Sequence, residues 1–552
     1  MVTQMLRNGV NFFSKKQNSI LSAAIVISGM MLISRILGLV RARLLAGIFG
    51  AGPELDIYFA SFRLPDLLFQ LLVMGALSSS FIPVFNSYLK KEKQEEAWRV
   101  ANYTINAASI IFIIIAVFIL IFTKNLAQII TPNFAPWQIE KMVPLIRIMM
   151  LGQFFLVVSN FVTGVLQSFK RFLIPAISPI LYNAGIILGI IFLSERHGVM
   201  GPAVGVAIGC FSHLIIQIPL VYKLGFRKFS FKIDIKNKGL REIGKLMLPR
   251  TLGLAVNQID PTIDLILASA IAGGTSIFNL ALNIQSVPVG LFGFAIGTAA
   301  LPTLSQESTK KSLKEFKKIF LDSFHQILFL TIPAGVFLVI LRVPIVRLFL
   351  GTGKFDWQDT LLTSLSLGMF SVSIFAQSLV HLLARAFYAL HDTKIPVLTS
   401  LISVLVNIIA AILLVRTSLS VAGLALAASL ANIVNAALLF TLLDQKIGGF
   451  DRKKTFVPAT KIGFVSFAMG LAIYLPVKVL DQVFLDTSYT INLIILVVLV
   501  SSFGGMVFVF LSYILDIKEL KIFINLLRKI RDFPRHFVEK GVEEVEDVIA
   551  EK

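Results

Sequence analysis

Charged residues and cysteine are scarce in this chain of 552 residues. Charged side chains make up 15% of it, whereas soluble proteins carry roughly a quarter. This composition excludes a disordered chain and argues against an ordinary soluble enzyme. The single cysteine, Cys210, excludes an intrachain disulfide and a thiolate metal cluster. The six histidines are scattered and show no metal-ligand spacing.

Motifs for nucleotide binding and for nucleophilic catalysis are also missing. The sequence contains neither the phosphate-binding pattern G-x-x-x-x-G-K-[ST] nor the nucleophile pattern G-x-S-x-G. We therefore expect no enzyme activity and no cofactor of the kind that these motifs would bind.

Hydrophobic residues dominate the chain instead. They make up 56% of it, and the mean hydropathy is +0.84. Fourteen apolar runs are long enough to cross a bilayer. Each run must be a helix, because backbone polar groups in hydrocarbon need partners within their own segment and no run alternates like a barrel strand. The sequence predicts an all-α polytopic membrane protein with 14 transmembrane helices. The runs are residues 20–39, 55–85, 101–123, 142–167, 174–193, 202–222, 246–270, 277–304, 319–341, 361–384, 395–415, 421–441, 458–477 and 490–516.

The formal net charge of +20 lies mainly in short loops between the apolar runs. Most loop lysines and arginines follow the even-numbered runs, so these loops and both chain ends are predicted to be cytoplasmic. A basic charge can also indicate nucleic-acid binding, but this loop bias is typical of membrane topology. We expect no nucleic-acid partner.

An internal repeat divides the chain into two halves. Residues 35–38 (RILG) recur as residues 250–253 (RTLG), and the stretch 167–175 before the fifth run is echoed by 385–396 before the eleventh. Two six-helix lobes follow, in a parallel pseudo-two-fold repeat that is typical of alternating-access transporters. The predicted divisions are an N-lobe (1–222), a cytoplasmic linker (223–245), a C-lobe (246–441), two C-terminal helices (442–516) and a basic amphipathic tail (517–552).

Ionisable residues inside the apolar runs are candidates for function, because a charge in the bilayer is costly. Arg35 and Arg250 are repeat-equivalent, and two guanidinium groups facing one cavity would bind a diphosphate well. Asp56, Arg63 and Asp66 could instead pair with neighbouring charges and join the first two helices. Further polar positions in the seventh and eleventh runs are Asn257, Gln258, Asp260, Asp264 and Asn407.

The tail from residue 518 onward has apolar residues at helical spacing with basic residues between them. This pattern suits a helix lying at the anionic inner leaflet. A partner-binding tail is the alternative.

Several short motifs extend over the first twelve runs. They are SRILGLVR (34–41), FGAG (49–52), RLP (63–65), GALS (75–78), FIPVF (81–85), LPRTLG (248–253), VPVGLFG (287–293), GT (297–298), LPTLS (301–305), GKF (353–355) and RAFYAL (385–390). In combination these motifs resemble the MurJ (MviN) family, the lipid II flippases of bacterial peptidoglycan synthesis.

The resemblance implies the fold of the multidrug/oligosaccharidyl-lipid/polysaccharide exporter superfamily, in which two extra helices form a hydrophobic groove. It implies a bacterial inner-membrane flippase for lipid II, with the diphosphate and head group crossing the cavity. On this basis Arg35, Arg41 and Arg250 engage the diphosphate, and Asp56 and Arg63 position the substrate or gate the outer side. The resemblance implies no cofactor other than a monovalent cation such as Na⁺, and the cation candidates are Asp260, Asp264 and Asn407. Energy for transport would come from an ion gradient, from the membrane potential or from the gradient of the substrate itself.

The sequence departs from the family pattern at three places. The family usually reads L-P-N-L-L-R-R where residues 64–70 are LPDLLFQ, so Asp66 is an added negative charge. Asn283 stands where the family has a cavity arginine, and we expect it to face the substrate. Ala42 replaces a common acid. The alternatives are therefore an exporter of another lipid-linked oligosaccharide or drug and a membrane scaffold for cell-wall synthesis enzymes.

Overall fold

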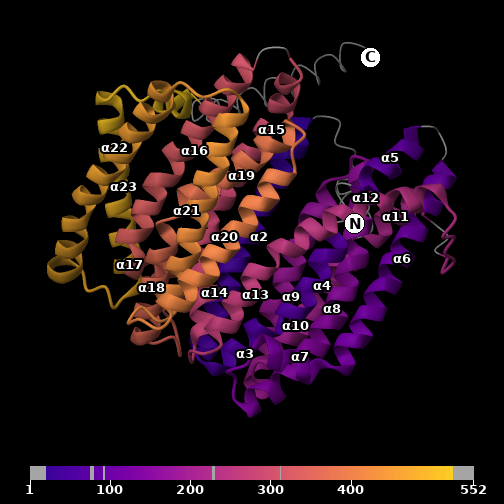
Figure 1. Cartoon of the computed structure of the whole chain (residues 1–552). Helices are drawn as coiled ribbons and strands as arrows, with labels where there is room; N and C mark the ends of the chain where they lie inside the picture. The colour runs from indigo at the N-terminus through magenta and orange to yellow at the C-terminus, as the bar shows by residue number, and fades with distance from the viewer. Residues whose placement is uncertain (1–19, 75–79, 91–93, 227–229, 311–312, 526–552) are drawn as a thin grey trace, which may run out of the picture. The chain divides into compact units, whose positions relative to one another are not determined.

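Helices are the only regular elements in the part of the chain that the structure describes (Figure 1). This computed structural model describes residues 20–74, 80–90, 94–226, 230–310 and 313–525. Within these ranges the backbone alone is described for residues 20–28, 74, 248–250, 252–254, 257 and 483. The predicted all-α class is confirmed.

The chain forms two compact units. Unit 1 comprises Met1–Ile284, Val346–Met369 and Ser400–Ala431. Its helices are α2 (Ile20–Phe49), α3 (Pro53–Ser61), α4 (Arg63–Phe69), the π-helical turn η1 (Gln70–Met74), α5 (Ile82–Lys90), α6 (Gln94–Ile121), α7 (Thr123–Ile130), α8 (Pro136–Ser168), α9 (Leu173–His197), α10 (Met200–Ile215), α11 (Ile218–Lys223), α12 (Lys238–Asn257) and α13 (Ile259–Ala268).

Unit 2 comprises Gln285–Ile345, Phe370–Thr399 and Asn432–Lys552. Its helices are η3 (Val289–Phe294), α15 (Ala295–Ser308), α16 (Lys314–Ile340), α19 (Ile374–Ala389), α22 (Arg452–Val479), η4 (Leu480–Phe484) and α23 (Thr490–Ile514). Five helices begin in one unit and end in the other: α14 (Gly274–Pro288), α17 (Arg342–Leu350), α18 (Trp357–Ser371), α20 (Lys394–Leu414) and α21 (Val421–Lys446). The lobe boundaries predicted from the internal repeat stay a prediction. The two units are defined by spatial contacts, and such units do not test boundaries inferred from a sequence repeat.

Ten helices in the described ranges are long and apolar enough to span a membrane, or eleven if α18 and α19, bent by 44° at their junction, form one span. The chain is therefore a multi-pass membrane protein. The count of fourteen stays a prediction, because some of the predicted runs are not single helices. The run at 55–85 is broken into α3, α4, η1 and α5, and the run at 246–270 is broken between α12 and α13.

Glycines allow α9 and α10 to pack closely, and these helices lie side by side with α8 (Figure 1). A Cβ atom at Gly205 would lie 2.7 Å from the carbonyl oxygen of Gly185, and one at Gly189 would lie 2.7 Å from the Cα of Gly205. Small residues at four-residue spacing are the usual means by which membrane helices approach each other. The close packing of α9 and α10 therefore depends on glycine, which has no Cβ atom, at these positions.

We expect Gly205→Ala to destabilise the protein by about 1–3 kcal/mol, because the added methyl group overpacks a backbone contact. The thermal unfolding midpoint of the purified protein in detergent measures this loss. Gly463→Ala in α22 is the control, because nothing lies within 4 Å of a Cβ atom at Gly463. Equal midpoints for the two variants would contradict the close-packing account.

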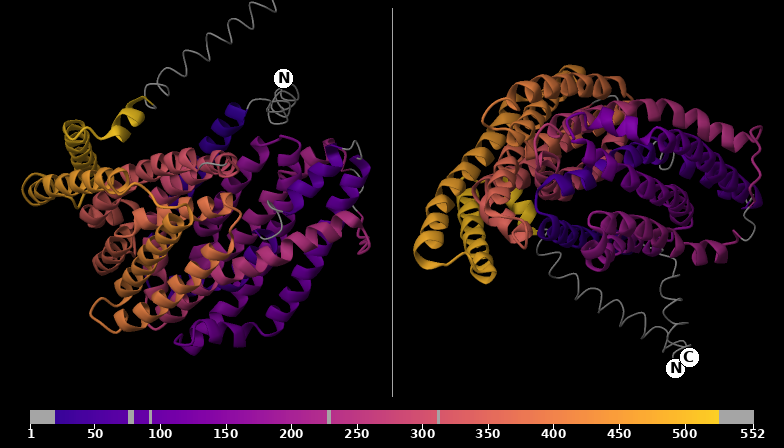
Figure 2. Two further views of the ribbon diagram at one scale, coloured as in Figure 1. Left: turned by 45° about the horizontal axis from the view of Figure 1, so that its top comes forward. Right: turned by 90° about the horizontal axis from the view of Figure 1, so that it is seen from below.

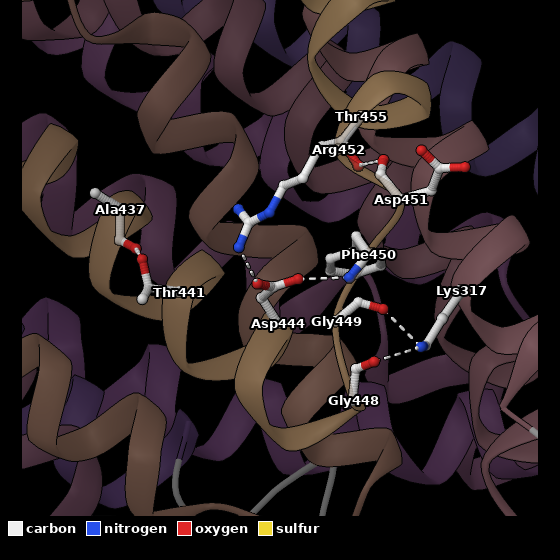
Figure 3. A network of polar contacts seen from close by, with 10 residues as sticks. All are labelled: Lys317, Ala437, Thr441, Asp444, Gly448, Gly449, Phe450, Asp451, Arg452 and Thr455. Atoms are coloured by element: carbon white, nitrogen blue, oxygen red, sulfur yellow. Dashed lines mark hydrogen bonds and ion pairs between the residues drawn. The ribbon is translucent and has the colours of Figure 1, made fainter.

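Aromatic rings and a polar network hold the turn between α21 and α22 in unit 2. Phe450 in this turn stacks on Phe320 and Phe440, with ring centroids 5.2 and 5.5 Å apart. Figure 3 shows the polar contacts: Lys317 donates to the carbonyl oxygens of Gly448 and Gly449, at 3.2 and 2.6 Å. A cation at these carbonyls stabilises the C-terminal end of α21.

Asp444 and Asp451 complete this network from the two helices (Figure 3). Asp444 accepts from the Phe450 N–H at 2.6 Å and from Arg452 at 3.0 Å. Asp451 caps α22 by accepting from the N–H groups of Lys453 and Lys454. These contacts fix the start of α22, which lies beside α23 (Figure 2).

The beginning of the predicted tail packs on unit 2. Ile517 and Leu520 are 3% exposed within the core cluster, and Phe523 and Ile524 pack against it. Glu519 lies 3.9 Å from His325 of α16. This part of the amphipathic stripe therefore contacts protein, and residues 526–552 of the predicted tail lie outside the described residues.

Candidate functional site

The arginines of α2 differ in how they are bound. Arg35 is half-buried and makes no hydrogen bond or ion pair within the described part of the chain. The adjacent Ser34 is held by Asn183 of α9, whose Nδ2 donates to the Ser34 Oγ at 3.1 Å. Arg41 interacts electrostatically with Asp66 of α4. Both guanidinium groups thus keep donors for an anion.

A third arginine of α2 has a different role. Arg43 donates from Nη1 to the Leu348 carbonyl oxygen of α17 at 2.5 Å. This contact joins distant segments of unit 1 and occupies the end of its side chain. Arg43 is thus a packing residue, which distinguishes it from Arg35 on the same helix.

Asp56 is 1% exposed and fully engaged with another part of unit 1. Its Oδ2 accepts from the Gly273 N–H at 2.7 Å, and its Oδ1 accepts from the N–H and the Oγ of Ser276 at 2.7 and 2.8 Å. These donors lie at the N-terminus of α14, where a carboxylate is favoured by the helix dipole. The structure thus shows Asp56 joining α3 to α14, while a substrate contact stays a prediction.

Arg63 and Asp66 bind other helices and do not form an ion pair with each other in the described residues. Arg63 donates to the Thr262 Oγ1 at 2.9 Å and to the carbonyl oxygen of Gln258. Gln258 lies at the break between α12 and α13. Arg63 therefore donates a hydrogen bond to a backbone carbonyl oxygen at a helix interruption. Asp66 accepts from Gln153 of α8 at 2.7 Å. The expected pairing of neighbouring charges is replaced by contacts to α8, α12 and α13.

Asp260, Asp264 and Asn407 come together as one cluster. The Nδ2 of Asn407 donates to Asp260 Oδ1 at 2.6 Å and to Asp264 Oδ1 at 2.9 Å. Asn407 is fully buried, and its Oδ1 is a buried acceptor without a hydrogen-bond partner in the described part of the chain. Two carboxylates and a free amide oxygen form a donor set that suits a hard monovalent cation. The spacing of four along α13 places both carboxylates on one face.

Two predicted substrate residues are placed only in part. Arg250 lies in α12, but its side chain is outside the described residues. Asn283 lies on α14 and is exposed. Asn257 ends α12, and its side chain is also outside the described residues.

One arginine of unit 2 was given no role by the sequence. Arg385 of α19 donates to Thr298 Oγ1 at 2.9 Å and to the His381 carbonyl oxygen at 3.0 Å, and it lies over the Phe294 ring. In the sequence, its motif (residues 385–390) belongs to the internal repeat and to the family resemblance, and neither assigns a role to the arginine. These partners carry no negative charge, so they do not neutralise the positive charge of Arg385 on α19.

An apolar groove lies within unit 2. It has a volume of about 410 Å³ and is lined by α16, α19 and α22 together with the end of α18. Its lining includes Gly335, Gly470, Phe375 and Phe467. The resemblance places a hydrophobic groove at the two C-terminal helices, and α22 is one of the helices that line this one.

Comparison with known proteins decides the family. The family model described as "Lipid II flippase MurJ" matches residues 45–495. The chain belongs to the MurJ family. Curated MurJ-family proteins named "Probable lipid II flippase MurJ" are similar: that of Thermotoga maritima is 31% identical over 88% of this chain and 95% of its own, and that of Buchnera aphidicola (Acyrthosiphon pisum, strain APS) is 29% identical over 92% and 99%.

Solved structures agree with the assignment to the MurJ family. "Lipid II flippase MurJ, inward closed conformation" is 27% identical, covers 89% of this chain and 98% of its own, and gives a TM-score of 0.74. An inward-facing MATE-family multidrug transporter of the MOP superfamily shares the fold, with 16% identity, coverage of 77% and 98%, and a TM-score of 0.61. The named MurJ relatives are flippases, so the prediction of a transport protein without enzyme activity is confirmed.

Proposed function

We propose that this chain is a lipid II flippase, which moves the lipid-linked peptidoglycan precursor from the inner to the outer leaflet of the bacterial cytoplasmic membrane. The observation that carries this proposal is the family match over residues 45–495. Similarity to a solved lipid II flippase over 89% of the chain adds support. Both chain ends would then be cytoplasmic, as the loop charges favour.

Arginines of unit 1 would bind the diphosphate of the substrate. Arg35 has donors without partners among the described residues, and Arg41 lies near the acidic Asp66. A guanidinium group binds phosphate oxygens bidentately and keeps its charge at any physiological pH. Arg250 and the exposed Asn283 would complete the polar surface. Asp56 would support this surface by holding α14, and Arg63 by holding the α12–α13 break.

A monovalent cation such as Na⁺ would bind at Asp260, Asp264 and Asn407. The unpaired Asn407 Oδ1 and two carboxylate groups bonded to the same amide favour such an ion. A bound cation would neutralise charge at this cluster. Arg63 donates to Gln258 and Thr262, which lie on either side of Asp260 in the sequence. A rearrangement of this cluster would therefore change the contacts of Arg63.

Alternating access by the two repeat-related lobes would carry the head group across. An elementary charge crossing 100 mV of membrane potential supplies about 2.3 kcal/mol, enough to bias two conformations of similar energy. The apolar groove of unit 2 would accommodate part of a polyprenyl chain, because its walls are aliphatic and aromatic. Cell-wall synthesis proteins are plausible further partners at the basic cytoplasmic loops.

Complementation of a bacterium depleted of its own flippase tests this function. We expect the wild-type chain to restore growth and outward exposure of lipid II. We expect Arg35→Ala and Arg250→Ala, at matched protein levels, to lower exposure at least about tenfold, because each removes charge-assisted hydrogen bonds to phosphate.

Arg99→Ala is the matched control, because Arg99 is exposed and, among the described residues, forms an ion pair with Glu95 alone. Full activity of both Arg35→Ala and Arg250→Ala would contradict the diphosphate assignment. Failure of the wild-type chain would point to another lipid-linked oligosaccharide as the substrate, and rescue by variants without any cavity charge would point to a scaffold.

A further inference from the structure

A buried amide faces the acidic side chain of α4 in unit 1. Asp66 is partly buried, and its Oδ1 accepts from the Nε2 of Gln153 at 2.7 Å. Gln153 lies in the middle of α8 and is 2% exposed. The Oε1 of the same amide is buried and has no hydrogen-bond partner among the residues that the structure describes. One half of the amide is therefore paired with Asp66, and the other half lacks a donor.

A proton on Asp66 would supply this donor. A carboxylic acid and a primary amide pair through two antiparallel hydrogen bonds, one from the amide N–H to the acid oxygen and one from the acid O–H to the amide oxygen. The structure contains the first bond, and an ionised carboxylate cannot make the second. We propose that Asp66 and Gln153 form a proton-binding site, in which Asp66 holds the proton and Gln153 is the positioning residue.

The charges around Asp66 allow the proton to leave again. Arg63 on the same helix and Arg41 on α2 both favour the carboxylate, yet neither forms an ion pair with it in the described residues. The other titratable groups that interact with Asp66 are neutral in their ordinary forms: Tyr58 of α3, Tyr182 of α9 and Cys210 of α10. The described parts of η1 and α6, which also contact α4, contribute no titratable group that interacts with Asp66.

The surroundings of the Asp66 carboxyl group therefore have opposite effects on its charge state. Two cations stabilise its ionised form, whereas removal from water and the unpaired amide oxygen stabilise its neutral form. The side chain is partly exposed, so protons can reach it. This site depends on contacts within unit 1 and does not depend on the flippase proposal. Coupling of proton binding to transport would depend on that proposal.

Infrared difference spectroscopy of the purified, substrate-free protein tests the site. Spectra recorded between acidic and alkaline pH report the carbonyl stretch of each carboxyl group that takes up a proton. We expect a wild-type band that is lost in Asp66→Asn and shifted to higher frequency in Gln153→Leu, because the acid then lacks its amide partner. Asn at position 66 still pairs with the Gln153 amide, so folding should be retained.

Glu54→Gln is the matched control, because Glu54 of α3 is an accessible carboxylate whose one bonding partner within the described ranges is Lys141. We expect the assigned band to persist in this variant. A difference spectrum of Asp66→Asn identical to that of the wild type would overturn the proposal, and so would a band that Gln153→Leu leaves unshifted while all variants melt like the wild type. Neither result would bear on lipid II exposure, so failure of the proton site and failure of the flippase function are distinguishable.

Discussion

Replacing Asp56 with alanine is expected to lower the free energy of unfolding by roughly 3 kcal/mol or more. The change removes the acceptor of three hydrogen bonds, from the Gly273 N–H and from the N–H and Oγ of Ser276. These donors lie in a buried region, where an unpaired polar group is costly. The start of α14 would also lose a stabilising negative charge at its positive end.

Thermal unfolding of the purified variant, followed by size-exclusion chromatography after heating, measures the loss at position 56. Asp56→Asn retains one acceptor oxygen, so its midpoint should fall between those of the wild type and Asp56→Ala. Asp322→Asn, at an exposed position of α16, should leave the midpoint unchanged. An Asp56→Ala protein that melts with the wild type would show that this connection does not stabilise the fold.

Replacing Asp264 with asparagine is expected to weaken the apparent affinity for Na⁺ at least about 100-fold, since altering even the groups around a metal ligand typically costs 10- to 100-fold. Asp264 is 6% exposed and shares the Asn407 amide with Asp260. Its carboxylate supplies half of the negative charge of the cluster. The neutral amide of the variant would leave a single carboxylate to attract the ion.

The shift of the melting midpoint with Na⁺ concentration, at constant ionic strength with choline, measures this affinity, because a ligand that binds only the folded state raises its stability. Asn407→Leu should also abolish the Na⁺-dependent shift. Asp322→Asn should melt with the same Na⁺ dependence as the wild type. Equal Na⁺-dependent shifts in the wild type and in Asp264→Asn would place any cation site elsewhere.

Helix class, transport function and several polar positions could be predicted from the sequence, because they depend on local composition. The apolar runs determine helices in a bilayer, and the cost of burying charge identifies Asp260, Asp264 and Asn407 as unusual. The structure brings these three side chains together, and their role in cation binding stays a prediction. The four-residue spacing of the two aspartates was a local signal for one shared helix face.

Long-range partners could not be predicted in the same way. Asp56 bonds to residues 217 and 220 positions further along the chain, and no local pattern indicates which donors a buried carboxylate will find. The partner of Arg63 was ambiguous for the same reason, since Asp66 lies three positions away in the sequence and carries the opposite charge. Arg63 instead donates to the carbonyl oxygen of Gln258 at the break between α12 and α13, which also accepts from the Thr262 hydroxyl. Gln153 was missed because a lone glutamine in an apolar helix carries no distinctive spacing.

Lipid II exposure by the purified protein in sealed vesicles tests the central claim most directly. Lipid II is placed in the inner leaflet, a membrane potential is applied, and an impermeant reagent reports its arrival at the outer leaflet. We predict exposure by the wild-type chain and by Arg99→Ala, and at least about tenfold slower exposure by Arg35→Ala. Exposure by the wild-type chain no faster than in protein-free vesicles would contradict the account.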